Sequence, residues 1–169
     1  TGSESHVKYQ EAAYFTSDDC IWVALYLPSI AEWDKQGIII EQECKWPAEH
    51  STIRIAKGKG TFAMKLRIPY WATEGVGISL NGTPIKGEFP PCSYVTIPKR
   101  KWHKGDVVEI HLPFTKHINY GPDRMNTAAT APNETSTPFA PLWNGTLMYG
   151  PLAMGTTGID NWDDATITI

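Results

Sequence analysis

Residues 61–114 read TFAMKLRIPYWATEGVGISLNGTPIKGEFPPCSYVTIPKRKWHKGDVVEIHLPF, and the pattern within them sets the fold class. At the start of this segment every second residue is apolar: Phe62, Met64, Leu66 and Ile68. Charged Lys65 and Arg67 lie between these positions. Because successive side chains of a strand point to opposite faces, this alternation is typical of a strand with one buried face.

The middle of the segment predicts a β-hairpin. Residues 76–80 alternate in the same way and lead directly into Asn81-Gly82. Asn-Gly accepts the positive φ angles of a two-residue turn, so residues 83–86 are expected to pair with residues 76–80. The end of the segment predicts two more strands, over residues 94–97 and 107–112.

Short strand-like segments also lie before and after residues 61–114. Residues 20–27 (CIWVALYL) are apolar at nearly every position, which predicts a central strand covered on both faces. Further strands are expected over residues 37–44, 51–56, 116–120, 146–149 and 152–154. The basic run Lys99-Arg100-Lys101 is interpreted as a solvated corner, and the Pro-rich, polar residues 121–141 as a long surface loop. Strands at such short spacing predict an all-β fold, an antiparallel, jelly-roll-like β-sandwich.

One segment near the beginning favours a helix instead. Residues 3–13 start with a serine that can act as N-cap, and Glu4 and Lys8 are four residues apart in the stabilising order. No preceding element is present for this helix to pack on, so it is interpreted as the remnant of a larger helical structure. The expected organisation is a helical remnant over residues 1–15 and a β-sandwich domain over residues 16–169.

Composition excludes two classes of partner. The 169 residues carry a net charge of -3 and have a pI of about 5.9, which gives no attraction for nucleic acid or for an anionic membrane. No apolar run approaches the ~20 residues of a membrane helix. Aromatic residues make up 11% of the chain, which fits either a sandwich core or exposed rings that stack on sugars.

The histidine, cysteine and acidic residues that could form a catalytic or metal site are scattered along the sequence. The five histidines form no HxH, HExxH or His-Cys cluster, so neither a metal site nor a catalytic residue is expected in this chain. The three cysteines, Cys20, Cys44 and Cys92, are too few and too widely spaced for a disulfide framework. They are interpreted as buried thiols, with one chance disulfide left open. The acidic residues within 160–164 are interpreted as a solvated turn rather than a calcium site.

Five motifs, taken together and in order, resemble a known family. They are TGSESHVKYQEAAYF at the start, LRIPYWA, ISLNGTPIKG, SYVTIPKRKWHKGDVVEIHLPF and the late LMYGPLAMG. The resemblance is to the C-terminal part of β-L-arabinofuranosidase-type glycoside hydrolases (families 127 and 146), and it covers nearly the whole chain. It implies a β-sandwich that follows a catalytic (α/α)6 barrel. The first residues of this chain would then be the end of the last barrel helix.

The resemblance also implies a chemistry for the parent enzyme. That chemistry is retaining hydrolysis, in which a zinc-held cysteine thiolate attacks the anomeric carbon and a glutamate serves as acid/base. These groups would lie upstream of Thr1, so the chain is expected to be inactive alone and to hold no cofactor, zinc being implied for the parent only. Glu4 and His6 would lie nearest the missing site, as possible substrate contacts. The upstream barrel is the expected partner, and a periplasmic or secreted location is expected for the parent.

Two functions of other classes stay open beside a non-catalytic domain that supports the barrel. One is a carbohydrate-binding module that stacks exposed aromatic rings on plant-type, arabinose-containing glycans. The candidate rings lie at expected strand ends or in loops: Trp33, Trp46, Trp71, Trp143 and Trp162. The other is a structural or interaction domain without sugar contact, for which an exposed apolar surface is the expected trace. The supporting domain of a glycoside hydrolase is favoured over both.

Overall fold

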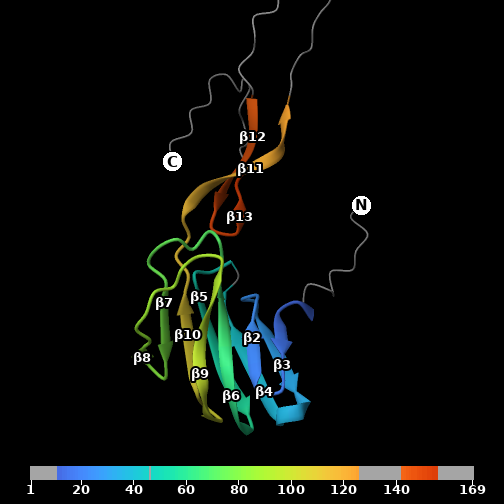
Figure 1. The fold of residues 1–169 in the computed structure, drawn as a ribbon, viewed down its shortest axis with the longest axis vertical. Coiled ribbons are helices and arrows are strands. Elements are labelled where there is room, and N and C mark those ends of the chain that lie inside the picture. The colour runs from blue at the N-terminus through green and yellow to red at the C-terminus, as the bar shows by residue number, and fades with distance from the viewer. Residues whose placement is uncertain (1–10, 46, 126–141, 156–169) are drawn as a thin grey trace, which may run out of the picture. The chain divides into compact units, whose positions relative to one another are not determined.

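A computed structural model describes residues 11–45, 47–125 and 142–155. The chain forms two compact units, divided between Pro113 and Phe114. The first unit is a sandwich of two β-sheets that share one core (Figure 1). The second unit holds a smaller sheet. The all-β, predominantly antiparallel fold is therefore confirmed.

The sandwich consists of a four-stranded and a six-stranded sheet. The four-stranded sheet has the order β1-β2-β6-β9, with β1 (Tyr14–Thr16), β2 (Cys20–Val23), β6 (Lys59–Ile68) and β9 (Ser93–His103). The six-stranded sheet has the order β3-β4-β5-β10-β7-β8, with β3 (Ser29–Trp33), β4 (Ile38–Glu43), β5 (His50–Lys57), β10 (Val107–His111), β7 (Gly77–Leu80) and β8 (Thr83–Pro84). A short 3-10 helix, η1 (Asp34–Gln36), connects β3 and β4. In these two sheets β2 and β6 pair in parallel, whereas the other described pairs are antiparallel.

The alternating residues of β6 form the centre of the core. The apolar positions predicted to face inward are completely buried: Phe62, Met64, Leu66 and Ile68. The Phe62 ring centroid lies 5.1 Å from that of Trp33 in the opposite sheet and 5.4 Å from that of Trp102 in its own sheet. Each fully buried apolar side chain contributes about 1.5–3 kcal/mol to folding, so this strand is a major source of stability.

The predicted hairpin is present. Leu80 of β7 lies opposite Thr83 of β8, and Asn81-Gly82 forms the turn between them. The two turn residues have φ angles of 49° and 75°, a conformation that Asn and Gly tolerate better than other residues do. β7 also pairs with β10 on its other side, so the hairpin extends the six-stranded sheet.

Two local predictions are wrong. Lys99-Arg100-Lys101 does not form a corner but lies within β9. That strand stays paired with β6 as far as His103 because Trp102, 1% exposed, is anchored in the core. A register shift between Phe62 and Met64 accommodates one extra residue of β9. The turn follows at Lys104-Gly105 instead. The cysteines are all free thiols, but only Cys20 is buried, whereas Cys44 is half-buried and Cys92 is exposed.

The second unit contains a three-stranded antiparallel sheet in the order β11 (Lys116–Met125), β12 (Leu142–Tyr149) and β13 (Leu152–Ala153). The strands predicted after residue 114 are therefore confirmed, and the first of them continues to Met125. The predicted helix lies almost wholly outside the described residues, as do the acidic turn within 160–164 and most of the predicted loop. The domain boundary at residue 15 stays a prediction. No helix in the described part of the chain is long and apolar enough to cross a membrane.

Candidate functional site

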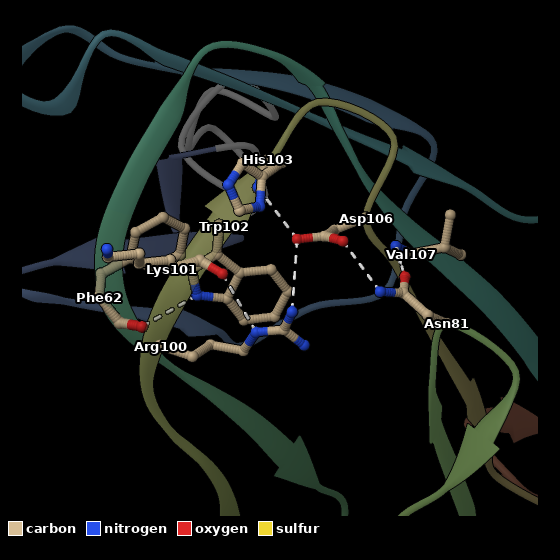
Figure 2. Close-up of polar contacts among 8 residues, drawn as sticks. All are labelled: Phe62, Asn81, Arg100, Lys101, Trp102, His103, Asp106 and Val107. Atoms are coloured by element: carbon tan, nitrogen blue, oxygen red, sulfur yellow. Dashed lines mark hydrogen bonds and ion pairs between the residues drawn. The ribbon is translucent and has the colours of Figure 1, made fainter.

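The Asp106 carboxylate ties together two turns at one end of the six-stranded sheet (Figure 2). Its Oδ1 accepts a hydrogen bond from Nδ2 of Asn81 at 2.8 Å, and its Oδ2 accepts one from the backbone N–H of His103 at 2.9 Å. Asn81 Oδ1 accepts a hydrogen bond from the backbone N–H of Val107, and the Asn81 N–H donates to the Val107 carbonyl, both at 2.8 Å. The β7–β8 turn is thereby fixed to the β9–β10 turn.

Arg100 completes this cluster. Its Nη2 lies 3.7 Å from Asp106 Oδ2, and its guanidinium carbon lies 4.9 Å from the centroid of the Trp102 ring (Figure 2). Burial pushes the pKa of Asp106 upward, but the hydrogen bonds from a backbone N–H and from Asn81, together with the nearby Arg100 charge, outweigh it, and the pKa is lowered. The carboxylate is therefore charged at neutral pH and acts as an anchor between strands.

A second group of polar residues lies on the outer face of the six-stranded sheet. His50 of β5 and His111 of β10 are cross-strand partners, and their rings stack with centroids 4.1 Å apart and planes 9° apart. His111 Nε2 lies 3.7 Å from Glu49 Oε2. In the next row across the sheet, the Ser79 hydroxyl of β7 donates to Glu109 of β10 at 2.8 Å. These side chains point away from the core and do not pack inside it.

The residues predicted to contact sugar do not gather in one place within the described structure. Four lie outside the described residues: Glu4, His6, Trp46 and Trp162. Trp143 belongs to β12, and its stacking role stays a prediction. Trp71 is half-buried and packs against the core. Trp33 is only 6% exposed and packs edge-on against Phe62, so the stacking prediction is wrong for it, because the alternation of β3 directs this ring inward.

An aromatic surface that none of these predictions included lies on the outer face of the four-stranded sheet. Phe15 of β1 is 53% exposed and lies opposite Trp22 of β2. The Lys65 Nζ of β6 lies 5.0 Å from the centroid of the Trp22 ring. Tyr94 of β9 is 44% exposed and lies opposite Arg67 of β6. The sequence carried a signal for Trp22, since this residue stands between two apolar neighbours whose inward orientation turns it outward.

The described residues offer no metal centre, and two of the three thiols are poor nucleophiles. Within residues 11–45, 47–125 and 142–155, no group of three or more His, Cys, Asp or Glu side chains could hold a metal ion. Burial raises the pKa of the Cys20 and Cys44 thiols, and a protonated thiol is a poor nucleophile. The described side chains therefore do not fit the zinc that the resemblance implies for the parent enzyme.

The fold and these clusters define a two-sheet β-sandwich domain with a single shared core, and both polar clusters described above lie at its surface. The family model described as "Beta-L-arabinofuranosidase, GH127 middle domain" matches residues 20–114. Since the match spans more than half of the chain, the chain belongs to this family. No curated protein sequence matches the chain.

Solved structures with this fold include three relatives of much greater length. A glycoside hydrolase is 22% identical over 86% of this chain, with a TM-score of 0.64. A GH127 β-L-arabinofuranosidase from Geobacillus stearothermophilus T6 is 23% identical over 86% of the chain, with a TM-score of 0.59. A GH127 β-arabinofuranosidase is 26% identical over 83% of the chain, also with a TM-score of 0.59. This chain spans only 21% to 23% of the length of these proteins.

Proposed function

We propose that this chain is the non-catalytic β-sandwich domain of a β-L-arabinofuranosidase-type glycoside hydrolase and supports a separate catalytic domain of the same polypeptide. One observation carries the proposal. The middle-domain model matches residues 20–114, a range that begins with β2 and ends where the sandwich unit ends. The family match and the compact unit end within one residue of each other, which supports a role as one self-contained domain of a longer enzyme.

The outer face of the four-stranded sheet is the proposed contact surface for the catalytic domain. Phe15, Trp22 and Tyr94 lie on this face together with Lys65 and Arg67. Aromatic and Arg side chains are enriched at protein interfaces, and exposed apolar groups on one face are typical of a surface that another domain covers. One edge strand of this sheet is β1, which begins within the last residues of the segment interpreted as a helical remnant.

The proposal assigns hydrolysis to the catalytic domain and not to this chain. The cysteine nucleophile and the zinc implied by the resemblance would both belong to that domain. The contribution of the sandwich is to bury apolar surface of its neighbour and to hold that neighbour in a folded state. Burial of apolar surface contributes about 25 cal/mol per Å², so even a modest contact is worth several kcal/mol.

A domain exchange tests this proposal. The sandwich region of the Geobacillus enzyme is replaced by residues 11–114 of this chain, and the Tm and arabinofuranosidase activity of the hybrid are compared with those of the enzyme without any sandwich. We expect the hybrid to keep a folded, active catalytic domain and the truncated enzyme to aggregate or to melt several degrees lower. A hybrid that behaves like the truncated enzyme contradicts the proposal.

A pair of matched variants locates the contact. In the hybrid, Phe15→Asp should lower the Tm of the catalytic domain, because it places a charge on the proposed contact surface. Ile30→Asp is the control, since Ile30 is 68% exposed and lies on a strand of the other sheet. Equal effects of the two substitutions would contradict the assignment of this face.

A further inference from the structure

A groove lies on the outer face of the six-stranded sheet, at the strands β5, β10 and β7. Its lining combines polar and apolar groups, among them His50, Gly77, Ser79, Phe89, Glu109 and His111. The sandwich core does not depend on these polar groups, and the contact surface proposed for the catalytic domain lies on the other sheet. The groove is therefore available to bind a ligand.

Gly77 lines the groove. It pairs with His111 across the β7–β10 ladder, at a position where any other residue would project a side chain. A Cβ built on Gly77 would meet one neighbouring atom within 4 Å, the His111 Cβ at 3.8 Å, which is an ordinary van der Waals contact. The space is consequently available to a ligand, and a Cβ can be added at this position without a clash.

The polar wall is held in place before any ligand arrives. Glu109 is oriented by the 2.8 Å hydrogen bond from Ser79. The His111 ring is stacked on His50 and lies 3.7 Å from Glu49. A site whose groups are already ordered loses less conformational entropy on binding, so even a shallow groove can bind detectably.

Part of the lining is apolar. Phe89 and Ile85 belong to the segment after β8 and are half-buried against the core. The Phe89 ring thus shares the groove with a row of carboxylate and hydroxyl oxygens. Small-molecule sites commonly combine an apolar surface with a few placed polar groups in this way.

We propose that this groove binds a short, neutral carbohydrate. Sugar hydroxyls donate hydrogen bonds to carboxylates such as Glu109, while the C–H face of a sugar ring packs on aromatic and apolar surface. The Glu109 carboxylate in the lining repels an anionic sugar such as a uronate. The choice of sugar as ligand rests on the proposed function, because the domain would then lie beside a glycoside-hydrolase active domain. The open groove predicts a Kd of about 1 mM for a single oligosaccharide.

Binding of linear arabino-oligosaccharide to the 169-residue chain tests the inference, with backbone amide NMR shifts as the readout and oligogalacturonate as the anionic comparison. We expect arabino-oligosaccharide to shift amides of β7 and β10, and oligogalacturonate to bind at least tenfold more weakly. Absence of these shifts, or preference for the anionic sugar, overturns the inference. Neither result bears on the domain exchange, whose readout is the stability of the catalytic domain.

Gly77→Val is the decisive variant, because it fills the groove while valine is well suited to a strand. We expect it to weaken binding at least tenfold with an otherwise unchanged amide spectrum. Gly155→Val is the matched control, since no atom lies within 4 Å of a Cβ added at Gly155 and the residue lies in the other unit. Glu109→Gln keeps the shape of the wall and should also weaken binding. Unchanged affinity in both groove variants overturns the inference.

Discussion

The interior of the sandwich and the groove on its outer face are built from the same strands, but they obey different constraints. On β10, Val108 is completely buried and belongs to the core. Its neighbour Glu109 lines the groove. Inward residues decide whether the chain folds, because they carry the buried apolar area. Outward residues can vary at little cost to stability, and they decide what the folded domain binds.

Phe62→Ala should have the largest effect on stability. The Phe62 ring is completely buried between Trp33 and Trp102, so its removal leaves a cavity that well-packed neighbours fill poorly. We expect a loss of about 3–5 kcal/mol in unfolding free energy, measured by urea denaturation. Phe15→Ala is the control, because this ring is 53% exposed in the same chain and its loss should change stability by about 0.5 kcal/mol or less. Similar losses for both would show that the sheets do not share the core described above.

Asp106→Asn should have an intermediate effect that depends on pH. The side chain is 13% exposed and bound to Asn81 and the His103 N–H, so loss of its charge should cost about 1–2 kcal/mol at neutral pH. Because the folded-state pKa of Asp106 is lowered, its stabilising effect is present above the ordinary carboxyl pKa of about 3.9 and is lost as pH falls through the folded value. The stabilities of wild type and variant should therefore converge as the pH falls below the ordinary carboxyl range. A difference that stays constant from neutral to acid pH would contradict this role.

Ser51→Ala should have a small effect of opposite sign. Ser51 of β5 is 5% exposed, and its hydroxyl oxygen is buried without a hydrogen-bond partner among the described residues. A buried unpaired hydroxyl is unfavourable, so its removal should leave stability unchanged or raise it by up to about 1 kcal/mol. Thermal unfolding measures the change. A clear loss of stability would mean that the hydroxyl has a bonding partner.

Gly77→Val should have the smallest effect on stability of the four. The added Cβ makes only an ordinary van der Waals contact, with the His111 Cβ, so the unfolding free energy should stay within about 0.5 kcal/mol of the wild-type value. Urea denaturation of the variant used in the binding experiment provides this measurement. A large destabilisation would show that the groove is part of the packing and would remove the contrast between the two faces.

The sequence predicted those features that a local pattern determines. The alternation around Phe62 and the Asn-Gly dipeptide were sufficient for β6 and for the β7–β8 hairpin. The length of β9 was not predictable, because it depends on Trp102 reaching the core and donating to the Phe62 carbonyl at 2.9 Å. The parallel pairing of β2 with β6 also depends on residues distant in sequence.

The candidate site was predicted less well than the fold. A tryptophan at a strand end predicts a surface that stacks on sugars, but Trp33 lies in the core. Ala31 and Trp33 face inward, while Ile30 is exposed. The groove depends on the register that brings His50 opposite His111. No local signal fixes that register, because either histidine by itself reads as an ordinary surface residue. The groove therefore depends on strand pairing between residues that are distant in sequence.

The central claim is that this chain is a binding and supporting domain without hydrolytic machinery of its own. Its most direct test is an assay of the purified 169-residue chain on an aryl β-L-arabinofuranoside with zinc present. The account predicts release of the aryl group no faster than in buffer with zinc alone. Zinc-dependent turnover above that background, retained through purification, would contradict it.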